Sequence, residues 1–263
     1  MSKNKLLIIT LLGSLIVFAM IYYVLSSSFD DDPFSSSEIS KLSYLAEKGD
    51  GEACWCLFCY YDRIKDFEES SKWVEKGALC GDPRAQYLWA KTFLEENKSK
   101  EEVNKGIDIL IKSASQDYVD AQRELGSLYD EGKLIKRNVK QSEYWYFKAA
   151  ENGNYYAMFE LSKFIKENYD NREMLIEAYK WTLLSIKLGS TGGFIYEKVQ
   201  NLQKELLVKA TQMGIEKKYF IKLAEQKALI DEQKIRNHTS TSTRFETSCD
   251  VLYSLCKQKI MVK

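Results

Sequence analysis

The sequence predicts an all-α protein, a right-handed α/α superhelical solenoid of short helix pairs stacked in sequence order. Gly81, Asp117, Gly153 and Gly189 recur at a constant spacing of 36 residues. An alanine follows four residues after each of the first three, and a tryptophan precedes each of the last two by eight residues. The 263 residues contain only two prolines, so little interrupts helix formation.

The N-terminus predicts a membrane segment within residues 1–29. Lys3 and Lys5 precede an apolar run of 20 residues from Leu6 to Leu25, and three aspartates at 30–32 follow it. A helix of this length crosses the hydrocarbon core, and the charges place the N-terminus in the cytoplasm. We favour an uncleaved transmembrane helix as an inner-membrane anchor. A signal segment cleaved near Val24 and Ser26 is the alternative. Both place the folded part outside the cytoplasm, in the periplasm.

The clearest repeat begins at Asp117. Its first predicted helix carries one apolar stripe at i, i+4, i+7 and i+8, formed by Ala121, Leu125, Leu128 and Tyr129. Gly126 allows a neighbouring helix to approach closely, and Gly132 is placed to end the helix as a left-handed cap. The second helix carries Trp145 and the pair Ala149–Ala150.

This repeat closely resembles the Sel-one-like repeat, a relative of the tetratricopeptide repeat. The family pattern is matched by Ala121, Leu125, Gly126, Tyr129, Gly132, Trp145, Tyr146, Ala149 and Ala150, whereas Ser142 stands where the family often has alanine. The neighbouring repeats keep less of the pattern. The resemblance implies a protein-interaction solenoid and names no partner.

The resemblance covers about residues 40–190, so we assign the solenoid to 30–190. Its repeats lie at about 49–80, 81–116, 117–152 and 153–188, after a half-repeat at Ile39–Lys48 that serves as an N-terminal cap. Residues 191–236 are expected to hold two capping helices, near 194–211 and 216–236. Residues 237–263 are expected to form a polar linker and a cysteine-containing tail.

Six cysteines follow the apolar run, which permits disulfides in an oxidising compartment. Cys54, Cys56 and Cys59 share one predicted helix and do not easily bridge each other. Cys80 ends the next helix and is close enough to reach one of them, and Cys249 and Cys256 are candidates for closing a small loop. The disulfide candidates are therefore Cys59, Cys80, Cys249 and Cys256. Buried free thiols are the alternative for the first cluster.

The residue two positions after each first-helix alanine is the candidate partner-binding residue. These residues are Trp55, Tyr87, Arg123 and Phe159. Each lies about 200° around its helix from that alanine, off the stripe that packs within the repeat. Aromatic residues and arginine are enriched at interface hot spots, so we interpret this row as a partner-binding stripe. Packing against the adjacent repeat is the alternative.

The sequence predicts no enzyme. It contains no His-Glu-x-x-His, no Gly-x-Ser-x-Gly and no phosphate-binding glycine loop, and His238 is the only histidine. We expect no cofactor, no metal, no small-molecule substrate and no nucleic acid. Net charge is zero overall, with 13 acidic and 6 basic residues from Asp30 to Asp82, and 9 basic and 6 acidic residues from Glu197 to Arg236.

The functional hypothesis is a non-catalytic extracytoplasmic module that binds another protein. A small, membrane-anchored chain with degenerate Sel-one-like repeats resembles bacterial immunity proteins that are encoded beside type VI secretion effectors. The partner would then be a cognate toxin such as a phospholipase. A scaffold or adaptor of the envelope or secretory pathway is the alternative. A more remote one is a disulfide-rich repeat hydrolase of the β-lactamase-like type. That group resembles this chain poorly, because only Cys249 and Cys256 show its seven-residue cysteine spacing, outside the repeats.

Overall fold

A computed structural model describes residues 34–189, 194–241 and 249–262. Those residues form helices and no strand. The first seven are α2 (Ser36–Glu47), α3 (Gly51–Arg63), α4 (Phe67–Leu79), α5 (Pro83–Lys91), α6 (Lys100–Ala114), α7 (Val119–Glu131) and α8 (Val139–Glu151). The remaining five are α9 (Tyr155–Asn168), α10 (Arg172–Leu188), α11 (Phe194–Gln212), α12 (Lys217–Thr241) and α13 (Cys249–Val262).

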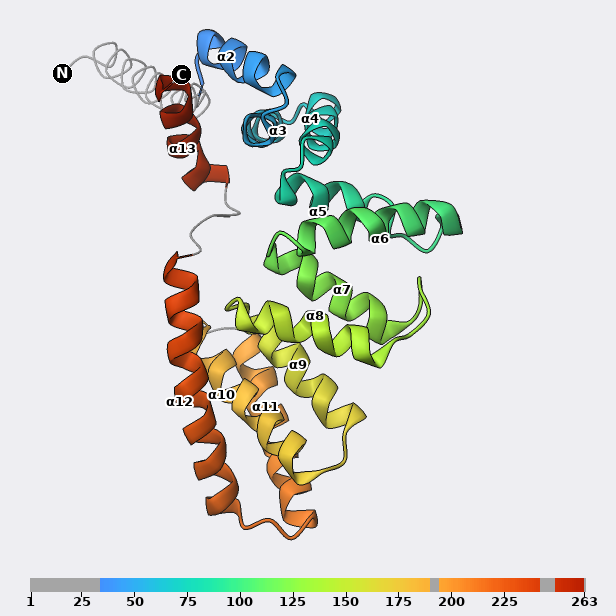
Figure 1. Cartoon of the computed structure of the whole chain (residues 1–263), viewed down its shortest axis with the longest axis vertical. Coiled ribbons are helices and arrows are strands. Elements are labelled where there is room, and N and C mark those ends of the chain that lie inside the picture. Colours follow the sequence, from blue (N-terminus) through green and yellow to red (C-terminus); the bar gives the residue numbers. More distant parts are fainter. Residues whose placement is uncertain (1–33, 190–193, 242–248, 263) are drawn as a thin grey trace, which may run out of the picture.

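Consecutive helices from α2 to α10 pack on one another in sequence order, which confirms the solenoid. Figure 1 shows these hairpins stacked along the long axis of the molecule, from α2 at one end to α11 and the start of α12 at the other. The pairs α3–α4, α5–α6, α7–α8 and α9–α10 are the four expected repeats, and α2 is the second helix of the expected half-repeat.

The 36-residue spacing marks backbone turns between repeats. Gly81 and Gly153 have φ values of 91° and 87°, and Asp117 between them has φ 61°. Glycine adopts this left-handed conformation freely, and aspartate is among the few other residues that tolerate it. Gly189 differs, with φ −86° and ψ 173°. The last interval of the spacing therefore ends in a different turn, before the capping helices.

Packing within a repeat follows the alanine and glycine positions. Ala53, Ala85, Ala121 and Ala157 are all fully buried. At Gly126, an added Cβ would lie 2.5 Å from Cδ1 of the Tyr146 ring. The expected close approach is therefore real, and it occurs between α7 and α8 of the same repeat.

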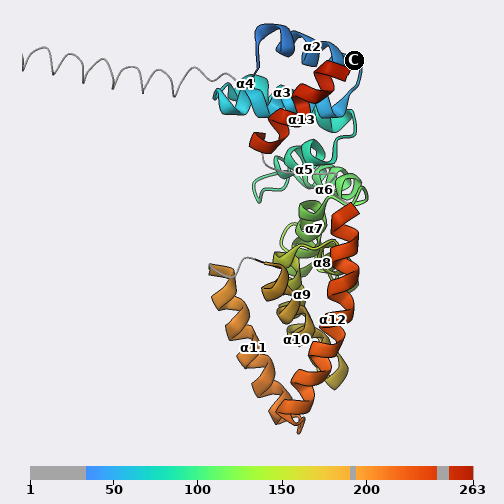
Figure 2. The ribbon, with the colours of Figure 1, turned by 90° about the vertical axis from the view of Figure 1, so that its left-hand side faces the viewer.

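The C-terminal region differs from expectation in two ways. First, α12 continues through Asn237 to Thr241, part of the segment that we expected to be a polar linker. Second, the tail is more than a short appendage: α13 packs against α3 and α2, about 200 residues earlier in the chain. Figure 2 shows α13 lying across α3 at the end of the stack that carries α2.

Within the described ranges, no helix has the length and hydropathy needed to span a bilayer. The apolar run Leu6–Leu25, which carries the prediction of an anchor, lies outside these ranges.

Candidate interaction surfaces

The first member of the expected partner-binding row, Trp55, is buried. Its side chain is 4% exposed, and its ring centroid lies 4.8 Å from that of Phe58. The guanidinium carbon of Arg84, on the first helix of the next repeat, lies 5.0 Å from the Trp55 ring centroid. Arg84 is fixed there because its Nη2 and Nε donate to the Asp82 carboxylate at 2.6 and 3.2 Å. Trp55 thus packs between repeats and presents no surface to a partner.

Tyr87 and Arg123, the middle members of the row, are half-buried and also face the next repeat. The Tyr87 ring centroid lies 5.4 Å from that of Tyr118, the residue that precedes α7. Burial of the Tyr87 hydroxyl raises its pKa, and the Glu124 carboxylate adds to this effect. Arg123 lies 3.7 Å from Glu124 and acts electrostatically on Glu160 of α9.

The row is therefore a seam between successive first helices, which was the alternative interpretation. Trp55 and Phe159 are only 4% and 9% exposed, which favours packing at these two positions, and a partner-binding role of the row stays a prediction. A first helix has neighbours on three sides: its own second helix, the preceding hairpin and the following one. The position about 200° from the packing alanine faces the following hairpin, so aromatic side chains there are used for stacking.

Phe159, the last member of the row, lines a groove between α9 and α11. The groove has a volume of about 280 Å³. It is lined by Phe159, Lys163, Lys166, Lys198, Asn201, Leu202 and Glu205. Phe159 and Leu202 are buried, whereas Lys163 is exposed. This seam is thus partly open, unlike the seam that covers Trp55.

A carboxylate beside this groove is desolvated. Burial raises the pKa of Glu160 above its ordinary value, although the nearby cations Lys163, Arg123 and Lys198 oppose the shift. The Lys166 ammonium forms an ion pair with Glu205 across the groove, joining α9 to α11.

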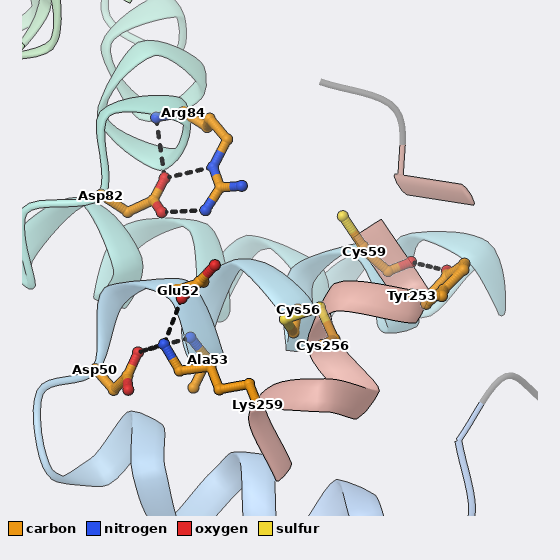
Figure 3. The surroundings of a disulfide bond; sticks show 10 residues. All are labelled: Asp50, Glu52, Ala53, Cys56, Cys59, Asp82, Arg84, Tyr253, Cys256 and Lys259. Atoms are coloured by element: carbon orange, nitrogen blue, oxygen red, sulfur yellow. Dashed lines mark hydrogen bonds and ion pairs between the residues drawn. A yellow bond between two sulfur atoms is a disulfide. The ribbon is translucent and has the colours of Figure 1, made fainter. Parts of the chain in front are cut away.

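A disulfide joins α3 to α13 at the other end of the solenoid. Figure 3 shows the bond between Cys56 and Cys256. The Cα–Cα distance between these residues is 6.1 Å. Tyr253 donates its hydroxyl hydrogen to the backbone carbonyl of Cys59 at 2.9 Å. Two turns further along α13, the Lys259 ammonium lies 2.8 Å from an Asp50 oxygen and 2.5 Å from a Glu52 oxygen.

These contacts show which place α13 occupies. Glu52 directly precedes the packing alanine Ala53, as Arg84 precedes Ala85. Arg84 faces the first helix of the preceding repeat, where it covers Trp55. Glu52 faces α13 in the same way. The half-repeat supplies α2 without a first helix of its own, and α13 covers the side of α3 that such a helix would face. It runs parallel to α2, in the reverse of the direction of a first helix.

The cysteine pairing differs from our expectation. Cys256 bonds to Cys56 and not to Cys249. Both tail cysteines belong to α13, where seven residues span about 10.5 Å, too far for a disulfide. The side chain of Cys249 lies outside the described residues. Cys59 is disulfide-bonded, whereas Cys80 carries a free thiol and is not.

Cys54 and Cys80 are the two free cysteines of the described chain. Burial raises the pKa of the Cys54 thiol to about 12, and the adjacent Cys80, which hydrogen-bonds with it, contributes to the shift. Cys80 thus reaches a cysteine of the first cluster, as expected. It contacts Cys54 and forms no disulfide with it.

Within the described ranges, no group of three or more histidine, cysteine, aspartate or glutamate side chains is arranged to hold a metal ion. Sequence reasoning missed Tyr253 and Lys259 as structural contacts. The only signal in the sequence was a complementary charge, with lysines in the tail and acidic residues in the first repeat. It was too weak to predict that Lys259 pairs with Asp50 and Glu52.

Comparison with known proteins identifies the class of this solenoid. Residues 119–154 match the family model described as Sel1 repeat. No curated protein matches. Residues 119–154 are therefore a Sel1-like repeat, as Tyr146, Trp145 and Gly126 indicated.

Two solved structures share the fold. A protective antigen of uropathogenic Escherichia coli strains, which displays an SLR fold, is similar with a TM-score of 0.61 and 19% identity over 86% of this chain and 47% of that one. A Sel1 repeat protein from Oxalobacter formigenes has a TM-score of 0.50 and 21% identity, covering 71% of this chain and 76% of that one. The chain thus spans about half the length of the Escherichia coli protein. Proteins of this fold mediate protein–protein interactions.

Proposed function

We propose that this chain is a non-catalytic protein-binding module that works outside the cytoplasm, as an immunity protein that captures a cognate secreted toxin. A stack of helix pairs holds a large rigid surface in place without needing a catalytic centre. An inhibitor of a toxin needs only such a surface in the compartment where the toxin acts.

The observation that carries the proposal is the Cys56–Cys256 bond, accompanied by a second bonded cysteine, Cys59. Structural disulfides persist in oxidising compartments and are rare in the cytosol. Here the bond joins α3 to α13, and it supports the proposal that the protein works in such a compartment. The Leu6–Leu25 run supports the same location through an anchor or a signal.

The proposal is tested by expressing the chain in cells that receive the product of the neighbouring gene in the periplasm. The full chain should protect and should co-purify with that product. A form without residues 1–29 should stay in the cytoplasm and fail to protect. Equal protection by both forms would refute the localisation, and protection by neither would refute the immunity role. Stable co-purification with an envelope protein instead of a toxin would favour the scaffold alternative.

A further inference from the structure

A mostly apolar groove lies between α2 and α13, which Figures 1 and 2 show together at one end of the stack. The groove has a volume of about 460 Å³. It is lined by Ser40, Lys41, Tyr44, Leu45 and Ile260. Among the described residues, no acidic side chain lines it.

Each of the two helices also leaves a large apolar side chain exposed at this end. Tyr44 of α2 is 64% exposed, and Met261 of α13, which directly follows the groove residue Ile260, is 79% exposed. Covering apolar surface of this kind is favourable, because it is removed from water. An exposed apolar groove with two such side chains therefore suits a partner that is itself apolar.

The charges around the groove do not favour an acidic or a basic partner. Lys41 and Lys257 both act electrostatically on Glu38, at the start of α2. Glu47, near the end of α2, forms an ion pair with Lys76. Because the acidic side chains here already face lysines, apolar contact and location decide what covers the groove.

The predicted membrane segment joins the folded chain at this same end. Phe34, the first described residue, is buried, and its ring centroid lies 5.4 Å from that of Tyr253 on α13 and 6.1 Å from that of Tyr60 on α3. The apolar run ends at Leu25, so residues 26–33 alone separate it from Phe34. A chain of this length extends over about 30 Å at most. A bilayer that holds the run is therefore within reach of α2 and α13.

We propose that the groove between α2 and α13 rests on the lipid surface beside the anchor, with Tyr44 and Met261 inserted at the level of the headgroups. The inference rests on the membrane-anchored form of the proposed function and adds a second contact with the same membrane. Tyrosine is enriched at membrane interfaces, and lysine side chains extend from there toward the headgroups. The Lys48 ammonium, 5.6 Å from the Tyr44 ring centroid, is placed to do so.

The short tether makes such docking effective even if the contact is weak. A surface held close to its partner experiences a high local concentration of it, so little intrinsic affinity is needed. Docking through α2 and α13 would fix the orientation of the stack on the membrane, and with it the direction in which the repeats face a protein partner.

The test uses the full chain reconstituted in phosphatidylcholine vesicles that contain a radiolabelled trace of the same lipid. The photoreactive residue p-benzoylphenylalanine replaces Tyr44. In two controls it replaces Phe67 on α4, or Tyr219 on α12 at the far end of the stack, both of them exposed aromatic residues. Flotation isolates the vesicle-bound protein. Illumination should then attach at least fivefold more lipid at position 44 than at either control position.

A charge placed beside the groove should prevent this labelling. With the probe at position 44, Met261→Asp should reduce the lipid adduct to the level of the controls, because a carboxylate is costly to desolvate. The matched variant Leu229→Asp adds the same charge at an exposed apolar position of α12 and should leave the adduct unchanged. Circular dichroism of both variants checks that the fold is intact.

Equal labelling at positions 44, 67 and 219 of floated protein would overturn the docking and retain the anchor. Failure of the full chain to float would reject the anchor and the docking together. An adduct of position 44 with a second copy of the chain, in place of lipid, would show that a protein covers the groove and would also overturn the proposal.

The toxin assay gives a separate answer. Protection in cells without a lipid adduct at position 44 would retain the immunity role and reject the docking. A lipid adduct specific to position 44, without protection, would retain the docking and reject the immunity role.

Discussion

Cys56, in the first full repeat, is bonded to Cys256, which lies 200 residues later in the sequence. The bond holds α13 against α3, on the side where no earlier repeat covers it. The two ends of the described chain therefore meet, and a solenoid that usually gains stability only from neighbouring repeats acquires one long-range constraint.

Replacing Cys56, Cys59 and Cys256 by serine should lower the free energy of unfolding by about 2–5 kcal/mol or more, because the disulfide constraints on the unfolded chain are then removed. Denaturant unfolding followed by circular dichroism measures this change. Cys80→Ser, at a free thiol, should cost much less. If the two variants were equally destabilised, the bond would contribute nothing specific. Peptide mapping of the parent without reduction should recover the 56–256 pair and identify the partner of Cys59.

Local sequence patterns predicted the repeats well, because each repeat packs through positions within about 36 residues of one another. Gly126 against Tyr146 and the left-handed Gly132 followed from one repeat alone. The position of α13 could not be predicted in this way, because Lys259 is about 200 residues from Asp50 and Glu52 in the sequence and meets them only in the folded protein. The burial of Trp55 could not be predicted for a related reason: periodicity identifies the face of a helix but not which neighbour covers it.

Gly126→Ala should destabilise the protein by about 1–3 kcal/mol through overpacking, since the new methyl group would meet the Tyr146 ring at 2.5 Å. The alanine would favour helix intrinsically, so the sign of the effect separates packing from propensity. Thermal unfolding measures the difference. Lys140→Ala, at an exposed helix position, is the control and should be nearly neutral. An unchanged or raised midpoint for Gly126→Ala would show that α7 and α8 approach less closely than described.

The attachment of α12 to α10 should weaken in acid. The buried Lys180 pairs with Glu177 and Asp231 at 2.6 and 2.8 Å. Burial alone would raise the pKa of each carboxyl, but Lys180 outweighs it together with Lys227 at Glu177 and with Lys234 at Asp231. Both pKa values are therefore held below their ordinary 4.5 and 3.8. A lowered pKa in the folded state stabilises the protein above the unfolded pKa, and that stability is lost as pH falls through the folded pKa.

Hydrogen exchange of α12 amides measures this effect, after correction for the intrinsic pH dependence of exchange. Protection should be constant from pH 7 to about 5 and should fall below about pH 4.5, where these carboxylates begin to gain protons. In a Lys180→Met variant, each carboxyl loses one of the two lysines that lower its pKa, so the fall should begin at higher pH. Identical profiles for the parent and the variant would contradict the assignment.

The two free thiols should differ sharply in reactivity. The thiolate is the reactive form of cysteine, and a pKa of about 12 leaves Cys54 almost entirely protonated at pH 8. Cys54 is also fully buried, whereas Cys80 is half-buried at the end of α4. Iodoacetamide added to the native protein should therefore modify Cys80 alone, and Cys54 should react only after denaturation. Mass spectrometry of the peptides reports both sites. Labelling of Cys54 at a rate similar to that of Cys80 would show that the α3–α4 hairpin opens readily. If both thiols were already lost before iodoacetamide is added, Cys54 and Cys80 would have oxidised to a further disulfide.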